Sequence, residues 1–270
     1  MKNNLLLFIC LFTAVLSGCK KDPPPPPPTV DSGKVTLRFT QTVDGNPLIT
    51  DSLMYVNAAG NQYLVNEVQY FISDVVLHGS DGSSVIIDDV ADIHYVDSDL
   101  PSTQEWSVVD PVKAGAYTSV TFVFGITAVK NMSYMYVNPP ERDMAWPEFL
   151  GGGYHYMKLN GKWKDTADQI VPFDFHMGIG QTYASGVIVV DSITGFVQNY
   201  FTVTMNNASF NVNKDATTTL EIRMNIESWF DTPHVWDHNV WGSYIMQNQT
   251  AMQTAKENGA DVFTLGSISY

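Results

Sequence analysis

Residues 153–178 read "GYHYMKLNGKWKDTADQIVPFDFHMG" and decide the fold class of the chain. Apolar and polar residues alternate at both ends of this stretch, and a period of two is typical of half-buried strands. The polar segment between them, "GKWKDTADQI" (161–170), is a plausible hairpin connection. The stretch therefore predicts two neighbouring antiparallel strands.

Similar runs, separated by Gly, Asn, Asp and Pro turns, extend this pattern along the chain. They lie at residues 34–42, 67–79, 84–88, 93–97, 116–125, 186–191, 198–212 and 217–226. In the first of them Val35, Leu37 and Phe39 alternate with polar residues. The prediction is an all-β fold, a Greek-key-like β-sandwich of about ten strands. Helical spacing in residues 241–259 predicts a short C-terminal helix.

The N-terminus has the pattern of an export signal. Lys2 precedes the apolar run "LLLFICLFTAVL" (5–16), which is too short for an ordinary transmembrane helix, and "LSGC" (16–19) follows. This ending resembles the lipobox of bacterial lipoproteins, in which cleavage leaves the cysteine, here Cys19, to be acylated. An uncleaved anchor or an ordinary secretory peptide is the alternative. We predict a signal peptide at 1–18, a lipidated Cys19 with a proline-rich stalk at 19–33, and a β domain at 34–270.

Composition narrows the possible partners. The chain has 14 Lys and Arg against 28 Asp and Glu, and removing the leader with Lys2 changes the net charge from −14 to −15. An acidic chain is unlikely to bind nucleic acid or to be held at a membrane by its charge. Attachment to the outer membrane of a Gram-negative envelope is therefore expected to come from the lipid anchor. The two cysteines are Cys10 and Cys19, both outside the β domain. A metal must therefore be held by His, Met, carboxylate or a less usual ligand.

Two histidines are the strongest candidate ligands. His155 lies in "YHY" and His176 in "FHM", and antiparallel pairing of their strands would allow both imidazoles to reach one metal. In strand geometry Met157 shares the face of His155, and Asp174 shares that of His176. Two imidazoles with nearby thioethers suit copper better than zinc and exclude an oxygen cage for calcium. Hydrogen bonding of both histidines to neighbouring carbonyls is the open alternative.

The other motifs in the sequence do not indicate a catalytic or metal-binding site. His234 and His238 have i, i+4 spacing, but Pro233 and the Asp and Asn residues around them indicate a turn that leads into a helix. The chain has no G-x-S-x-G elbow, no H-E-x-x-H and no phosphate-binding loop. We therefore do not expect an enzyme.

Five segments together resemble the MbnP-like family of exported copper-binding proteins. They are "VNEVQYFISDVVLHGSDG" (65–82), "VKAGAYTSVTFVFGI" (112–126), "MAWPEFLGGGYHYMKLNG" (144–161), "FDFHMGIG" (173–180) and "IMQNQTAMQTAKENGADVF" (245–263). The resemblance implies a β-sandwich-like domain that binds Cu(I) or Cu(II), with His176 as a ligand. It also implies that Trp146 corresponds to a tryptophan oxidised to kynurenine in some members, with a dihaem cytochrome c peroxidase-like partner. Where the family pattern leads us to expect a histidine, this chain has Glu148. Either His155 supplies the second imidazole, or the fold is shared without the site.

The expected function is that of a lipid-anchored copper-binding protein that captures or stores the metal without turnover. Met144 and Met177 are expected as additional donors, Trp146 as a modified ligand or a shield, and Glu148 and Tyr154 as residues that support the ligands. Residues 151–153, three consecutive glycines, allow positive φ and a sharp turn that could bring the indole back over the histidine. The alternative is a metal-free surface β-sandwich that binds glycan or protein through exposed Trp and Tyr.

Overall fold

The computed structural model describes residues 30–88, 92–206 and 208–270. Residues Asp31–Tyr270 form one compact unit. The predicted signal peptide, the lipidated Cys19 and nearly all of the predicted stalk lie outside the described residues. Within the described part, no helix has the length and apolar character needed to cross a bilayer.

Two sheets form the sandwich, and β1 (Ser32–Val43) is central to the first of them. It pairs in parallel with β16 (Thr217–Asn225), which pairs antiparallel with β17 (Phe263–Ser269). Three short strands pair antiparallel with β1, namely β2 (Asn46–Pro47), β7 (Glu105–Ser107) and β8 (Val112–Lys113). Val35, Leu37 and Phe39 are buried as predicted, because alternate side chains of β1 face the core.

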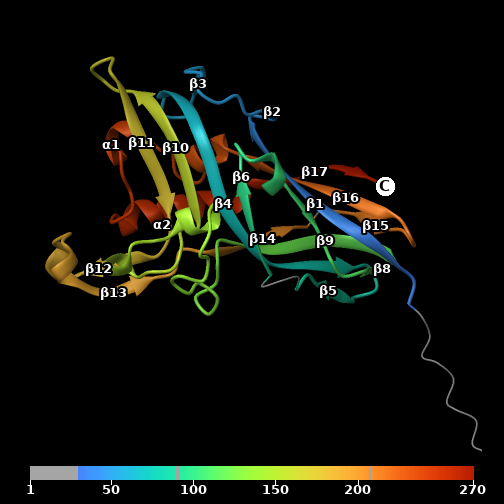
Figure 1. Cartoon of the computed structure of the whole chain (residues 1–270). Helices are drawn as coiled ribbons and strands as arrows, with labels where there is room; N and C mark the ends of the chain where they lie inside the picture. Colours follow the sequence, from blue (N-terminus) through green and yellow to red (C-terminus); the bar gives the residue numbers. More distant parts are fainter. Residues whose placement is uncertain (1–29, 89–91, 207) are drawn as a thin grey trace, which may run out of the picture. The chain divides into compact units, whose positions relative to one another are not determined.

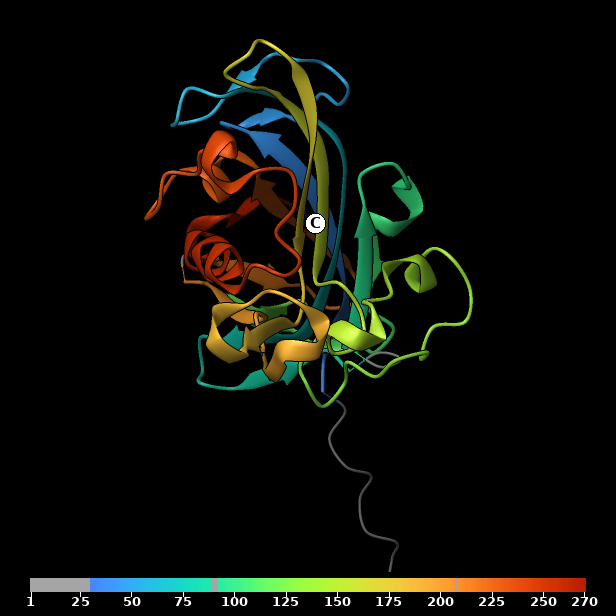
Figure 2. The same ribbon diagram turned by 90° about the vertical axis from the view of Figure 1, so that its left-hand side faces the viewer.

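The second sheet is built around the long strand β4 (Gln62–Gly79), beside which β10 and β11 run (Figures 1 and 2). Its main order is β11-β10-β4-β9-β14, for β11 (Ile170–Met177), β10 (Met157–Lys164), β9 (Gly115–Phe124) and β14 (Phe201–Met205). β15 (Phe210–Val212) pairs with β9, while β3 (Tyr55–Val56), β5 (Ser84–Ile86) and β6 (Ile93–Asp97) pair with β4. A separate two-stranded sheet contains β12 (Gly180–Tyr183) and β13 (Ile193–Val197).

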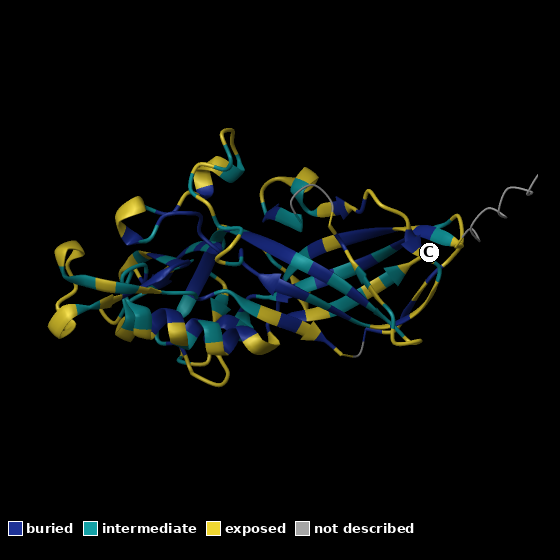
Figure 3. Ribbon diagram, turned by 90° about the horizontal axis from the view of Figure 1, so that it is seen from below, coloured by how far each residue is buried: buried dark blue, intermediate teal, exposed yellow. Residues whose placement is uncertain are grey.

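Aromatic side chains join the two sheets. The Phe263 ring of β17 lies 5.2 Å from the Phe122 ring and 6.1 Å from the Tyr70 ring, both measured between centroids. Buried and less buried residues alternate along the strands (Figure 3), as a half-buried sheet requires. Desolvation of these large side chains supplies the main driving force for the fold.

Among the described residues, helices are short. The α-helices found there are α1 (His238–Trp241) and α2 (Gln249–Asn258), both near the C-terminus. The 3-10 turns are η2 (Pro101–Thr103), η3 (Glu141–Met144), η4 (Glu148–Leu150), η5 (Ala184–Gly186), η6 (Val190–Ser192), η7 (Glu227–Phe230) and η8 (Gly259–Asp261). The Asn248 side chain caps α2 by accepting a hydrogen bond from the Ala251 N–H, which explains where this helix begins.

The predicted β-sandwich with a short C-terminal helix is confirmed, with two corrections to its elements. Residues 186–191 do not form the predicted strand, because Ser185 and Gly186 have positive φ and the chain forms the loop between β12 and β13. The helix is not the end of the fold either, since β17 follows it and adds an edge to the first sheet.

Candidate metal centre

The hairpin of β10 and β11 holds His176 in a fixed position. The two strands pair antiparallel as predicted, with Lys158 opposite His176 and Asn160 opposite Asp174. These four side chains alternate with buried residues and share the outer face of the sheet, where they are partly buried. His176 therefore lies on a rigid element, among polar neighbours.

His155 precedes β10 instead of lying within it, contrary to the prediction. Its backbone N–H donates to the Met144 carbonyl at 2.7 Å, so the chain has left the ladder with β11 at this point. In a continued strand His155 would share the parity of Met157 and face away from His176. The departure from strand geometry allows the two imidazoles to meet.

The three glycines form the turn that brings Trp146 to His155. Gly151, Gly152 and Gly153 have φ values of 120°, 67° and 76°. At Gly152 and Gly153 a Cβ would lie 2.5 Å from a neighbouring side-chain atom, so close approach is required as well as positive φ. The backbone N–H of Trp146 donates to the Gly153 carbonyl at 2.8 Å and closes the loop.

Three rings meet at this loop. The centroids of His155 and His176 are 5.2 Å apart with an interplanar angle of 86°, and those of Trp146 and His155 are 4.7 Å apart. His155 is 5% exposed and Trp146 is 2% exposed. The indole N–H donates to the Leu150 carbonyl at 3.1 Å, which fixes the orientation of the ring.

The hydrogen bonds assign a tautomer to each imidazole. His155 Nδ1 lies 2.9 Å from the Met144 carbonyl oxygen, and His176 Nε2 lies 2.6 Å from Asn160 Oδ1. Because each partner oxygen accepts, each of these nitrogens carries the proton, and the other nitrogen keeps a free lone pair. His176 Nδ1 is buried and has no hydrogen-bond partner in the described part of the protein. A buried polar atom without a partner is costly, and a ligand to this lone pair would remove the cost.

Both imidazoles are held neutral. Burial, with smaller electrostatic contributions from His176 and Lys158, lowers the pKa of His155 to about 3. Burial also lowers the pKa of His176 to about 4, again with a contribution from Lys158. Neutral imidazole is the form that binds metal, so protons do not compete for these nitrogens near neutral pH.

The remaining predicted site residues belong to the same loop and strand, and their roles stay predictions. Met144 and Met177 are both fully buried, and the Met144 carbonyl accepts the hydrogen bonds from His155. Glu148 is exposed, and its carboxylate lies against Gly152. Tyr154 is 1% exposed, and its hydroxyl accepts from the Tyr136 N–H at 2.8 Å in a neighbouring loop. Across the described residues no group of three or more His, Cys, Asp or Glu side chains gathers in metal-binding geometry.

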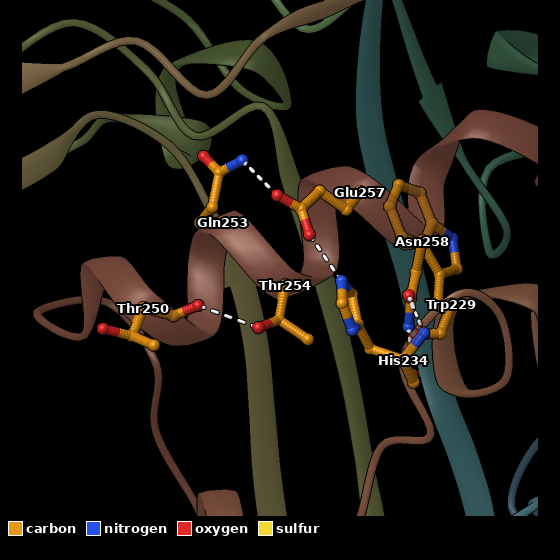
Figure 4. A network of polar contacts seen from close by, with 7 residues as sticks. All are labelled: Trp229, His234, Thr250, Gln253, Thr254, Glu257 and Asn258. Carbon is orange, nitrogen blue, oxygen red and sulfur yellow. Dashed lines mark hydrogen bonds and ion pairs between the residues drawn. The ribbon is translucent and has the colours of Figure 1, made fainter.

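The other two histidine candidates lie apart from this cluster. His234 contacts the Glu257 carboxylate of α2, which also accepts from Gln253, while Asn258 fixes the backbone of His234 (Figure 4). His238 is 1% exposed in an aromatic cluster at the start of α1. The segment leads into a helix as predicted, since α1 begins at His238.

Sequence reasoning missed Asn160 and Lys158, which contact or flank His176. The Asn160 side chain accepts from His176 and donates to Glu67 Oε2 at 3.4 Å, so it fixes the imidazole through a second residue. The signal was present in the hairpin, because its register determines which residues of β10 face His176. The register of the hairpin, and with it the position of Lys158 and Asn160 beside His176, follows from the length of the turn at residues 165–169.

Comparison with known proteins identifies the family and the fold of the chain. The MbnP family model matches residues 32–250. The chain belongs to the MbnP family. The solved structure of MbnP from Methylosinus trichosporium matches 89% of this chain and 99% of its own, at 15% identity and a TM-score of 0.56. That likeness shows a shared MbnP fold. No curated protein matches the chain.

Proposed function

We propose that this protein binds copper through His155 and His176 and captures or stores the ion outside the inner membrane. The observation that carries the proposal is the buried, unpartnered Nδ1 of His176, next to a second neutral imidazole. Buried nitrogens are usually hydrogen-bonded. His238 Nε2 also lacks a partner among the described residues, but the His238 ring lies among Phe and Trp side chains, whereas the His176 ring lies next to a second imidazole. Here Asn160 and the Met144 carbonyl occupy one nitrogen of each ring and leave the other as a potential ligand.

The separation of the rings fits one shared ion. An imidazole nitrogen binds such an ion at about 2 Å, and the ring centre lies about 1.2 Å behind it, so two rings at a tetrahedral angle have centres about 5 Å apart. The observed centroid separation is 5.2 Å. Neutral imidazoles, with the thioether of Met144 as an additional donor, form a set that suits copper. Met177 follows His176 on β11 and its side chain points to the opposite, buried face of the sheet, which argues against the predicted role of Met177 as a donor.

Trp146 would border the bound ion, because its ring contacts His155. An unmodified indole has an N–H donor and no lone pair for a metal, and here that donor is already bonded to the Leu150 carbonyl. Trp146 would then shield the ion from water. Oxidation to kynurenine would add an aniline nitrogen and would need a strong oxidant from a partner such as a dihaem cytochrome c peroxidase-like protein.

The N-terminal sequence also supports a proposal for where the protein is located in the cell. The lipobox-like "LSGC" would place the domain on a lipid anchor at Cys19, in the outer membrane of a Gram-negative envelope. The intact mass of protein purified from its own host tests both modifications. Acylation at Cys19 and the mass gain of a kynurenine within the peptide containing Trp146 are separate signals.

Copper titration of the purified protein tests the central claim. The wild type is expected to bind one copper ion, and a His155→Ala/His176→Ala double variant is expected to lose that binding. The matched control is His78→Ala/His234→Ala, which removes two histidines outside the cluster and should bind as the wild type does. Equal affinity in the wild type and the His155/His176 variant would sink the proposal.

The metal-free alternative depended on exposed aromatic side chains. Five of the six tryptophans are at most 8% exposed, namely Trp106, Trp146, Trp163, Trp229 and Trp236. A glycan-binding platform built on tryptophan therefore has little support on this surface. Tyr134, Tyr244 and Tyr270 are exposed, so the alternative of glycan or protein binding now depends on tyrosine.

A further inference from the structure

The turn of three glycines is held from outside by a second segment, residues 127–136 (the strap). The Ser133 hydroxyl accepts a hydrogen bond from the Gly153 N–H at 2.8 Å. The Asn131 side-chain oxygen accepts one from the Tyr154 N–H, also at 2.8 Å. The two residues directly before the first imidazole are therefore fixed by the strap.

The contact between the strap and the turn is close as well as polar. A Cβ at Gly152 would lie 2.5 Å from Ser133 Oγ, and a Cβ at Gly153 would lie 2.5 Å from Asn131 Oδ1. Because glycine has no Cβ, the two strap side chains can reach the backbone of the turn. The glycines thus allow the strap to bind the turn, in addition to bending the chain.

The two ends of the strap are fixed to the sandwich in different ways. At one end Lys130 Nζ lies 2.6 Å from Asp74 Oδ1 of β4 and 2.5 Å from Asp92 Oδ2, directly before β6. These three side chains are 22–33% exposed, so water screens the ion pairs less than it screens surface pairs. At the other end the Tyr136 ring stacks on the Phe71 ring, with centroids 5.8 Å apart.

Between its ends the strap has little apolar packing. Val129, Met132 and Tyr134 are 62–88% exposed. Tyr134 also has a φ of 63°, which is unfavourable for a residue with a side chain. A segment with such exposed side chains opens locally at a low cost in free energy. Its hold on the turn therefore depends on polar contacts, and above all on the two ion pairs of Lys130.

A metal ion cannot reach the paired imidazoles while the turn stays in place. His155 and Trp146 are 5% and 2% exposed, and the lone pair of His176 Nδ1 is buried. The rings of His155 and His176 are in contact, as are those of His155 and Trp146. An ion that binds between the imidazoles must displace part of the turn, and the strap opposes that displacement.

We propose that the strap positions His155 and controls the rate at which copper enters and leaves the pair of histidines, with Lys130 as its anchor. This inference rests on the proposed copper function and adds the regulation of the same site. Lys130 is a positioning residue, which acts through Asn131 and Ser133 and does not touch the ion. Because the strap closes over the free and the loaded site alike, its release changes both rates together and the affinity little.

Stopped-flow transfer of copper between the full mature protein and a chromophoric chelator measures both rates, with copper in the oxidation state that the wild type binds. We expect Lys130→Met to raise the rates of uptake and release at least about tenfold, the effect of losing one charge-assisted hydrogen bond. The affinity, which is the ratio of the two rates, should change less than about threefold. Lys130→Arg keeps the charge and should keep the wild-type rates.

Amide hydrogen exchange tests the anchor without copper. The N–H groups of Gly153 and Tyr154 donate to the strap, so their exchange reports its opening. In Lys130→Met we expect both amides to exchange at least about tenfold faster than in the wild type. Lys130→Arg should again restore the wild-type behaviour.

Lys113→Met is the matched control, because it removes an ion pair with Asp81 that lies outside the strap. It should change neither the amide exchange nor the copper rates. If Lys130→Met does not fold, as judged by circular dichroism, Asp92→Asn removes one of the two partners of Lys130 and gives the same comparison.

The results separate the two proposals. A wild type that binds copper, with unchanged rates in Lys130→Met, would overturn the control of access and leave the copper function intact. A faster release alone, with an equal loss of affinity, would also overturn it, because the strap would then stabilise only the loaded site. A wild type that binds no copper would overturn the copper function and the control of access with it. Unchanged exchange at Gly153 and Tyr154 would overturn the role of Lys130 as anchor, and so would an equal change in Lys113→Met.

Discussion

Replacing His238 with phenylalanine is expected to make the protein less sensitive to acid. The His238 ring is 1% exposed and lies 4.4 Å from the Phe173 ring and 5.5 Å from the Trp163 ring, between centroids. Burial lowers the pKa of His238 to about 3, and the charge of Asp237 opposes this only in part. The imidazole is therefore neutral in the folded protein at pH values where an unfolded chain protonates it.

The pKa difference fixes the sign and size of the effect. Below about pH 6.5 the unfolded chain takes up a proton at His238 and the folded chain does not, so stability falls with pH until about pH 3 is reached. Between pH 7 and pH 5 this linkage removes about 2 kcal/mol from the free energy of unfolding. Phenylalanine fills the same aromatic site, has no titrating group, and removes a buried Nε2 that has no partner in the described part of the protein.

Urea unfolding, followed by tryptophan fluorescence at pH 7 and pH 5, measures the effect. The wild type should lose about 2 kcal/mol more than His238→Phe over this interval. Both proteins keep His155, His176 and every carboxylate, so the difference between the two pH dependences isolates His238. Equal losses in the two proteins would refute the reasoning, because they would mean that His238 titrates alike in the folded and unfolded chains.

Two further substitutions test the surroundings of the candidate centre. In Gly178→Ala the new Cβ would lie 2.6 Å from Trp146 Cε3, so we expect a loss of stability of about 1–3 kcal/mol in thermal unfolding. The control Gly195→Ala, whose Cβ would lie 3.1 Å from Thr182 Oγ1, should lose less stability. Equal melting temperatures of the two variants would contradict this prediction. Asn160→Leu removes the acceptor that orients the His176 ring, so copper affinity in competition titrations should fall about tenfold to hundredfold with the fold retained, and an unchanged affinity would show that the ring is oriented by other contacts.

The sheets were predictable because alternation records burial directly. Val35, Leu37 and Phe39 alternate with polar residues, and β1 buries that side. Alternation does not record which strand lies next to which, so the parallel pairing of β1 with β16 and the edge strand β17 could not be derived from it. Partner choice depends on contacts between residues far apart in the sequence.

The exposed segment Val187–Val190 shows the limit of local propensity. Four consecutive β-branched residues favour a strand, yet they are 41–56% exposed in the loop between β12 and β13. Positive φ at Ser185 and Gly186 turns the chain immediately before them. A strand needs a partner as well as propensity, and the local sequence says nothing about the partner.

The candidate centre was predicted in its residues but not in its geometry. Types and spacing pointed to His155 and His176, and their antiparallel strands were expected to bring both rings to one metal. With the observed register, a continued strand would have put the two rings on opposite faces. The loop reconciles them, since the Met144 carbonyl accepts from both the backbone and Nδ1 of His155. The local sequence pattern does not reveal a hydrogen bond between residues so far apart in the chain as Met144 and His155.

Glu148 bears on the proposed copper site, because this carboxylate stands where the family pattern leads us to expect an imidazole. If the fold were shared without the site, no imidazole would be needed beside Trp146. Instead His155 packs 4.7 Å from the indole, between ring centroids, and only 5.2 Å from His176, while Glu148 is exposed at the outside of the turn. A second imidazole therefore reaches the same ring from the other end of the three-glycine turn. This arrangement supports the proposal that His155, at the root of the next strand, supplies the second imidazole.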